Sequence, residues 1–156
     1  MKNMLLAAAA MAALLSVASA EEKKKETWDV AKPPLPTRAV RIDVDEGTWM
    51  NVDVAPDGRT IAFDLLGDIY TLPIGGGTAT RIAEGLPFEM QPRFSPDGRR
   101  IAFTSDRGGG DNIWVMNRDG SDKRALTSEN FRLLNQPTWS PDGRYIAARK
   151  HFTTAR

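Results

Sequence analysis

The chain has 156 residues, a formal net charge of +1 and no cysteine. A chain of this length can bury one modest core but not two large ones. The near-neutral charge gives no electrostatic support for a nucleic-acid partner. The lack of cysteine excludes disulfides and thiolate chemistry, and a single histidine, His151, argues against a multi-histidine metal site in these residues.

Residues 1–20 have the pattern of a secretory signal peptide. Lys2 is followed by an apolar run from Met4 to Leu15, and the segment ends in Ala18-Ser19-Ala20. A positive start, a short apolar stretch and a small-x-small end predict export with cleavage after Ala20. The alternative is a transmembrane anchor, but the run is shorter than the ~20 residues that a spanning helix needs. We therefore expect a periplasmic or secreted protein with no membrane anchor after cleavage.

Residues 21–38 are predicted to form an extended linker. They are first charged and then proline-rich, so they offer little that can be buried. Residues 39–44, Ala-Val-Arg-Ile-Asp-Val, alternate with a period of two, as a half-buried strand does. We predict a strand here, at the start of a folded region that covers 39–156.

One turn sequence occurs three times in the folded region. Ala55-Pro56-Asp57-Gly58, Ser95-Pro96-Asp97-Gly98 and Ser140-Pro141-Asp142-Gly143 are each followed by an apolar, β-prone run. Proline presets its backbone angle, aspartate can bond its own backbone, and glycine tolerates a positive φ, so each copy predicts a tight turn. The prolines lie 40 (96 − 56) and 45 (141 − 96) residues apart. Three copies in one register predict a repeat architecture.

Each repeat reads as a series of short strands. The first predicts strands at 51–54, 59–65, 68–72 and 79–83, with a turn at Gly75-Gly76-Gly77. The second predicts strands at 91–94, 100–105, 112–116 and 123–127, with a turn at 117–120. The third has only two, at 136–139 and 144–148. Four strands in a unit of about 40 residues are typical of a propeller blade.

The predicted fold class is all-β: a partial β-propeller of about two and a half four-stranded antiparallel blades, after a signal peptide and an extended linker. Blade 1 covers about 48–85, blade 2 about 88–128, and a partial blade 3 about 133–156. A propeller typically closes with four or more blades. We therefore expect the chain to be the N-terminal part of a longer protein, with the strand near 40–44 completing the last blade of the ring.

No catalytic constellation is recognisable in the sequence. We found no Gly-x-Ser-x-Gly, His-x-His, His-Glu-x-x-His or phosphate-loop motif, so no catalytic, cofactor-binding or metal-binding residue is predicted. Asp57, Asp97 and Asp142 are spaced by whole blades and would not converge on one ion, so the turn role explains them. His151 is interpreted as an ordinary surface or strand residue.

Gly108-Gly109-Gly110-Asp111-Asn112 resembles a phosphate loop only in composition. It stands between two predicted strands rather than before a helix, so a hairpin loop is the better interpretation. From Ile101 to Ile113 this hairpin spans 12 residues, against 8 from Ile61 to Ile69 in the first blade. An insertion at one end of a propeller can serve binding.

The repeat resembles the WD40-like propeller repeat of TolB and tricorn-type proteins. The resemblance rests on Phe94-Ser95-Pro96-Asp97-Gly98-Arg99 and its copies, and it runs from about Gly47 to the end. Segments 46–50, 63–70 and 148–153 further resemble exported bacterial amidohydrolases. These carry such a propeller ahead of a metal-dependent hydrolase barrel. The resemblance implies a parent protein that cleaves C–N or related bonds, with a divalent metal such as zinc in a hydrolase domain outside this chain.

Three functions fit the propeller repeat. The preferred one is a non-catalytic propeller that supports substrate access or protein interaction for a metal-dependent hydrolase domain; its partners are that domain and the remaining blades. The second is a TolB-like periplasmic propeller that binds other periplasmic proteins or peptides. The third is the gating propeller of a prolyl-oligopeptidase-type serine peptidase. Sequence beyond Arg156 separates them: an early His-x-His supports the first, termination after about six blades the second, and a Gly-x-Ser-x-Gly the third.

Overall fold

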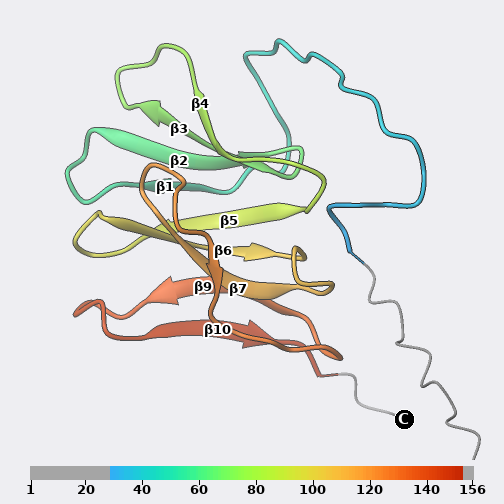
Figure 1. Cartoon of the computed structure of the whole chain (residues 1–156). Coiled ribbons are helices and arrows are strands. Elements are labelled where there is room, and N and C mark those ends of the chain that lie inside the picture. Colours follow the sequence, from blue (N-terminus) through green and yellow to red (C-terminus); the bar gives the residue numbers. More distant parts are fainter. Residues whose placement is uncertain (1–28, 153–156) are drawn as a thin grey trace, which may run out of the picture.

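The structure is a computed structural model that describes residues 29–152. Within that range it holds ten β-strands in three antiparallel sheets and no helix. The sheets stack face to face in chain order (Figure 1). The predicted signal peptide and the first eight residues of the predicted linker, 21–28, lie outside the described residues. The fold class is confirmed as an all-β, propeller-like stack of blades.

The first sheet contains β1 (Val52–Val54), β2 (Thr60–Leu65), β3 (Asp68–Pro73) and β4 (Thr80–Ala83), paired in that order. The second repeats the arrangement with β5 (Glu89–Phe94), β6 (Arg100–Ser105), β7 (Asn112–Asn117) and β8 (Arg124–Ala125). The third contains β9 (Leu134–Trp139) and β10 (Ile146–Lys150). We refer to the three sheets as blades 1, 2 and 3.

The hydrophobic core lies between the first two blades and extends through the second. Ile69 of β3, Ile101 and Phe103 of β6, and Met116 of β7 are almost completely buried in one cluster. All residues of β6 except its first are buried, because β6 has a blade on each face. Removing these aliphatic and aromatic side chains from water is the main stabilising contribution to such a stack.

The three Pro-Asp-Gly turns have the predicted geometry. Gly58, Gly98 and Gly143 have φ of +67°, +68° and +69°, which only glycine adopts without cost. In each turn the glycine N–H donates to the carbonyl three residues earlier. The aspartate Oδ1 accepts the backbone N–H two residues later, at 2.9 to 3.1 Å. The turn assignments are confirmed.

Side chains on the first two strands of a blade join it to the next blade. Asp64 Oδ2 accepts the Gln91 N–H at 2.6 Å, and Gln91 Oε1 accepts the Gln136 N–H at 2.7 Å. Gln91 and Gln136 have φ of +58° and +55°, and each lies at a break in strand register. Such a bulge turns a backbone N–H out of its own ladder. The backbone N–H groups of Gln91 and Gln136 are therefore each hydrogen-bonded to a side chain of the preceding blade.

The strand predicted at residues 39–44 is wrong. This segment has no regular secondary structure, and Val40, Ile42 and Val44 are 62%, 55% and 55% exposed. Alternation alone does not make a strand, because the backbone groups need a neighbouring ladder. No strand of the described residues pairs with this segment.

Candidate functional site

The two ends of the stack differ in their connections. The Pro-Asp-Gly turns lie at one end, which we call the turn end. The opposite end, the loop end, consists of residues 45–50, 66–67, 84–88, 106–111, 127–133 and 151–152. In Figure 1 the blades run between these two ends, and the strands alternate in direction. The loop end carries the connections that vary most in length, from residues 66–67 to residues 127–133, so it is the candidate functional site.

The connection between β6 and β7 is the insertion that the sequence indicates. It is a hairpin connection held at both ends by side chains. Asp106 Oδ1 accepts the Phe88 N–H at 2.8 Å. Asn112 Nδ2 donates to the carbonyl oxygens of Gly110 and Glu129 at 3.0 and 2.8 Å, and its Oδ1 accepts the Glu129 N–H at 2.7 Å. Asn112 therefore fastens the insertion to the next loop.

A buried ion pair underlies this end. Glu89, at the start of β5, is fully buried, and its Oε1 accepts hydrogen bonds from Arg107 Nε and Nη2 at 3.1 and 2.7 Å. Arg107 also donates to the Glu84 carbonyl at 3.2 Å. Burial raises the pKa of Glu89, and the bond to Arg107 opposes that rise. Sequence reasoning missed this pair, because the two residues lie 18 positions apart and nothing in the sequence indicates that they meet. It holds residues 84–88 against the insertion.

The candidate residues of the sequence do not meet in one place. Asp57, Asp97 and Asp142 lie at the turn end, where local hydrogen bonds hold the pKa of each carboxyl below its usual value. The chief cause is the Arg59 N–H for Asp57 and the hydroxyl of Ser95 or Ser140 for the other two.

His151 lies at the loop end, directly after β10, where its Nε2 is 3.2 Å from Asn135 Oδ1. Nearby, burial raises the pKa of Asp111, and the Asp106 carboxylate adds to that rise. Between residues 29 and 152, no three carboxylate, histidine or cysteine side chains gather as metal ligands.

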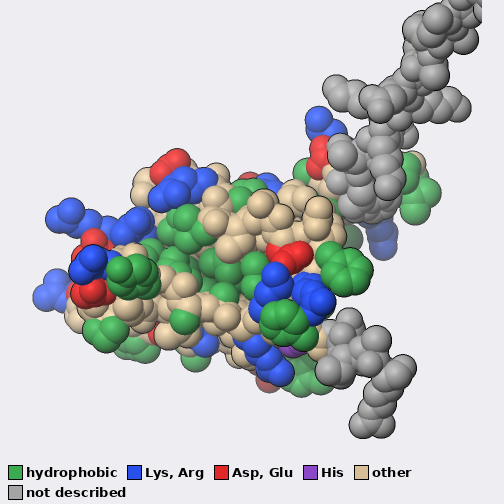
Figure 2. Space-filling view, turned by 90° about the horizontal axis from the view of Figure 1, so that it is seen from below, with side chains coloured by type: hydrophobic (Ala, Val, Ile, Leu, Met, Phe, Trp, Pro, Cys, Tyr) green, Lys and Arg blue, Asp and Glu red, His purple; other side chains and the backbone are tan. Residues whose placement is uncertain are grey.

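Large apolar side chains are exposed at the loop end. Trp49 is 99% exposed, Phe131 78% and Phe152 68%. Their companions at this end are Met50, Leu66, Leu86, Phe88 and Leu133. The Arg132 guanidinium lies over the rings of Phe131 and Phe152, 5.7 and 4.6 Å from their centroids. Figure 2, seen from below, shows Lys and Arg side chains among hydrophobic ones at both ends of the stack.

Residues 29–152 include no helix of the length and apolarity that crossing a membrane requires. The loop end presents exposed apolar and aromatic side chains together with the charged Arg132, on a scaffold of paired strands. Such a surface is suited to binding.

The comparisons with known proteins agree with this architecture. Tricorn protease homolog 1 of Streptomyces coelicolor is 34% identical over 93 residues, which cover 59% of this chain and 9% of that protein. The uncharacterized peptidase YuxL of Bacillus subtilis is 38% identical over 103 residues, 59% of this chain and 16% of that protein. The solved structure of a TolB-like protein from Agrobacterium tumefaciens matches with a TM-score of 0.61 and 30% identity, over 68% of this chain and 40% of that chain.

The chain thus spans less than half of the length of each of these proteins. The family model of the tricorn protease N-terminal beta propeller domain matches residues 53–156, which is two thirds of the sequence. This match takes in all three turn repeats and every strand of the stack except the first residue of β1, Val52. The chain belongs to the tricorn protease N-terminal beta propeller domain family.

Proposed function

We propose that this chain is the non-catalytic N-terminal propeller portion of a larger exported hydrolase, and that its loop end controls which substrates or proteins reach the hydrolase domain. The observation that carries the proposal is the gathering of eight large exposed apolar side chains at the loop end. Exposed apolar surface at one end of a soluble protein is a feature of interaction sites.

Two further observations support a hydrolase parent. Relatives of this chain are a tricorn protease homolog and a peptidase, and both are much longer than it. Segments 46–50, 63–70 and 148–153 resemble exported amidohydrolases in particular. We therefore propose an amidohydrolase parent that acts on C–N bonds, with a divalent metal such as zinc in the hydrolase domain.

The test uses the parent protein with Trp49→Ser and Phe131→Ser combined, since these are the two most exposed aromatic side chains of the loop end. We expect kcat/KM for a large peptide amide to change about tenfold while that for a small amide stays the same. Ile74→Ser is the matched control, because Ile74 is 57% exposed at the turn end. Equal effects of the loop-end pair on both substrates would rule out an access role.

A second candidate is a TolB-like propeller that binds periplasmic proteins and has no hydrolase domain. The match to the TolB-like structure favours it, because it covers more of both chains than either peptidase relative does. The reading frame beyond Arg156 decides between them. A barrel with an early His-x-His supports the amidohydrolase, termination after about six blades supports the TolB-like protein, and a Gly-x-Ser-x-Gly supports a gated serine peptidase.

Export is part of the same proposal. Residues 1–20 have the charge, the apolar run and the small-residue end of a secretory signal. Expressed in a bacterium with a Sec pathway, the mature protein is expected to begin at Glu21 in the periplasm. N-terminal mass spectrometry that found intact Met1 in the cytosol would contradict this proposal.

A further inference from the structure

Trp49 lies at the loop end in a backbone conformation that its residue type disfavours. Its φ is +57°, and its side chain is 99% exposed. A bulky residue in the left-handed region is a rare and costly outlier that persists only where the surroundings hold it. Here Gly47 lies so close to Met50 that an added Cβ would be 2.5 Å from its Sδ, and the Asn51 N–H donates to Asp64 Oδ1 at 2.8 Å. Strain kept at a fixed position, with the side chain in solvent, points to a role in binding.

A second strained residue presents an apolar side chain next to this bend. Leu66 has a φ of +54° and is 72% exposed. It follows Leu65, whose Cδ1 would lie 2.8 Å from a Cβ on Gly47. A Cβ on Gly67, the next residue, would lie 2.9 Å from the ring of Phe88, which is itself 52% exposed. Three neighbouring connections therefore carry large exposed apolar side chains, those of Trp49, Leu66 and Phe88.

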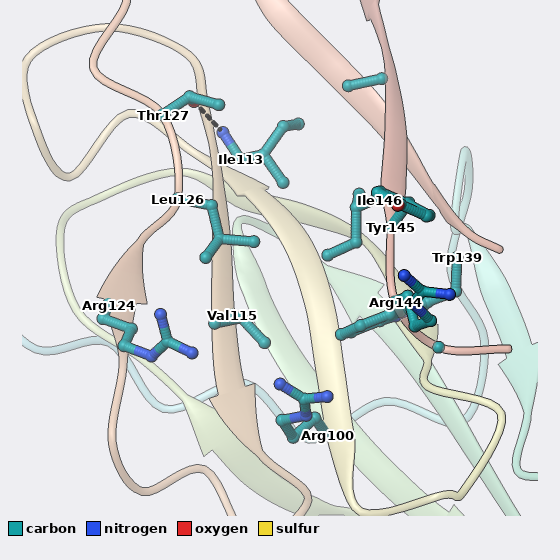
Figure 3. A pocket seen from close by; sticks show the side chains of 12 residues that line it. Arg100, Ile113, Val115, Arg124, Leu126, Thr127, Trp139, Arg144, Tyr145 and Ile146 are labelled. Atoms are coloured by element: carbon teal, nitrogen blue, oxygen red, sulfur yellow. Dashed lines mark hydrogen bonds between the residues drawn. The ribbon is translucent and has the colours of Figure 1, made fainter.

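Elsewhere the chain covers aromatic rings with its own cations. Arg or Lys groups lie 4.6 to 5.9 Å from the ring centroids of Phe94, Phe131, Trp139, Tyr145 and Phe152. The rings of Trp139 and Tyr145, with their arginines, line a groove of about 360 Å³ between β7–β8 and blade 3 (Figure 3). Within residues 29–152 no cation of the chain lies over Trp49, although indole is the ring that attracts cations most strongly.

The charges next to this uncovered indole are negative. Residues 43–50 contain three carboxylates and no Lys or Arg. Two of the three, those of Asp45 and Glu46, stand four and three residues before the tryptophan. All three are exposed, and none belongs to an ion pair in the described part of the chain. Arg81 and Arg107, by contrast, each already pair with a carboxylate. The ring and the carboxylates thus both attract a cation that the chain itself does not supply.

We propose that Trp49, Leu66 and Phe88 form a docking site for a substrate peptide that carries an arginine or lysine next to an apolar side chain. The cation lies over the indole, where Asp45 and Glu46 attract it, and the apolar side chain contacts Leu66 and Phe88. Charge complementarity identifies this occupant, because both attractions require a positive charge. The inference rests on the proposed function, since it names the class of substrate that the loop end admits.

Binding to the parent protein, followed by fluorescence anisotropy, measures this preference directly. The probes are two labelled peptides, acetyl-Ala-Leu-Arg-Ala-amide and the same peptide with citrulline in place of arginine, which keeps the shape and removes the charge. We expect the arginine peptide to bind about fivefold more tightly at low salt. The difference should shrink as the ionic strength rises, because screening weakens the attraction.

Two variants separate the ring from the carboxylates. Trp49→Leu keeps an apolar side chain and should lower the preference to about twofold or less. Asp45→Asn combined with Glu46→Gln should remove most of the salt dependence. Phe131→Leu is the matched control and should leave the preference unchanged, since the Phe131 ring already has Arg132 over it. Equal binding of the two peptides to the unaltered protein, or an undiminished preference in Trp49→Leu, would overturn the inference.

The exposure of Trp49 in the parent protein provides an independent test. Hydroxyl-radical labelling should modify the indole in the free protein and should modify it less once the arginine peptide is added. Protection before any peptide is added would mean that another part of the parent covers the site, and this would also overturn the inference. Neither measurement needs turnover, so failure here leaves the access test on kcat/KM standing, and failure of that test leaves a charge preference in binding unaffected.

Discussion

The two interfaces between blades are alike near the inner strands and different farther out. Near the inner strands, Gly98 lies against Pro56 and Gly143 lies against Pro96, at similar distances. A side-chain oxygen accepts an inner-strand N–H at both interfaces. Farther out, the first interface is closed by Gly120 and the second is an open groove. The repeat motif therefore makes similar inner contacts at both interfaces, while the outer contact of the first interface comes from Gly120, in the turn between β7 and β8.

The closed part of the first interface should be the most sensitive to a single added carbon atom. Gly120→Ala places a Cβ on the Ile82 carbonyl and adds the cost of a φ of +85°. We expect a loss of about 3 kcal/mol or more in the free energy of unfolding. Gly76→Ala is the matched control, because its φ is +89° and no atom lies within 4 Å of the new Cβ; it should cost about 1 kcal/mol. Equal costs in urea unfolding would mean that the blade contact contributes nothing.

The inner contacts should differ in strength because one acceptor is charged. Asp64→Ala removes an acceptor for the N–H groups of Asn51 and Gln91 and for the Asn51 amide. We expect a loss of about 2 kcal/mol, since a buried donor is left without its partner. Gln91→Ala removes a neutral acceptor for the Gln136 N–H and should cost about 1 kcal/mol. Thermal unfolding of both variants gives the order, and a larger loss for Gln91→Ala would contradict it.

The turns themselves should be equivalent at the two interfaces. Gly98→Ala and Gly143→Ala both introduce a side chain at a φ near +68°, and both new Cβ atoms have ordinary contact distances to a proline. Each substitution is expected to cost about 1 kcal/mol, with the two values close to each other. A clearly smaller cost for Gly143→Ala would show that blade 3 is less firmly ordered than blade 2.

The smallest effect concerns pH. The pKa of Asp57 is lowered in the folded state, first by the Arg59 N–H and then by Arg118. A carboxyl with a lowered folded pKa adds stability above its unfolded pKa, and this stability is lost as the pH falls through the folded value. Asp57→Asn should therefore reduce the thermal midpoint slightly at pH 7 and less at pH 3. An equal reduction at both values would indicate a role that does not depend on charge.

The sequence predicted the strands of the stack and the three turns because each depends on local chemistry. Ser95-Pro96-Asp97-Gly98 folds in the same way wherever two strands flank it. The failed strand at 39–44 shows the limit of that reasoning, because its pattern required a partner that no described strand provides.

Local sequence patterns also did not predict which side chains make contacts between blades. Asp64 acts on a residue 27 positions later, and Gln91 has a positive φ, which its residue type does not predict. The Glu89–Arg107 pair gave no signal either, since a charged residue at the start of a strand usually faces solvent. The sequence therefore predicted only the insertion between β6 and β7 as part of the candidate site. The exposed aromatic side chains belong to connections far apart in the sequence, so only the fold shows that they lie at the same end.

The hydrogen bonds that Asp64 and Gln91 accept from the next blade share one order along the chain. Asp64 accepts from Gln91, and Gln91 accepts from Gln136, so the acceptor always belongs to the earlier blade. A ribosome releases the acceptor of each such bond before the donor. Each newly added blade therefore meets a finished template, and the stack can grow by addition at one end when the chain is delivered N-terminus first.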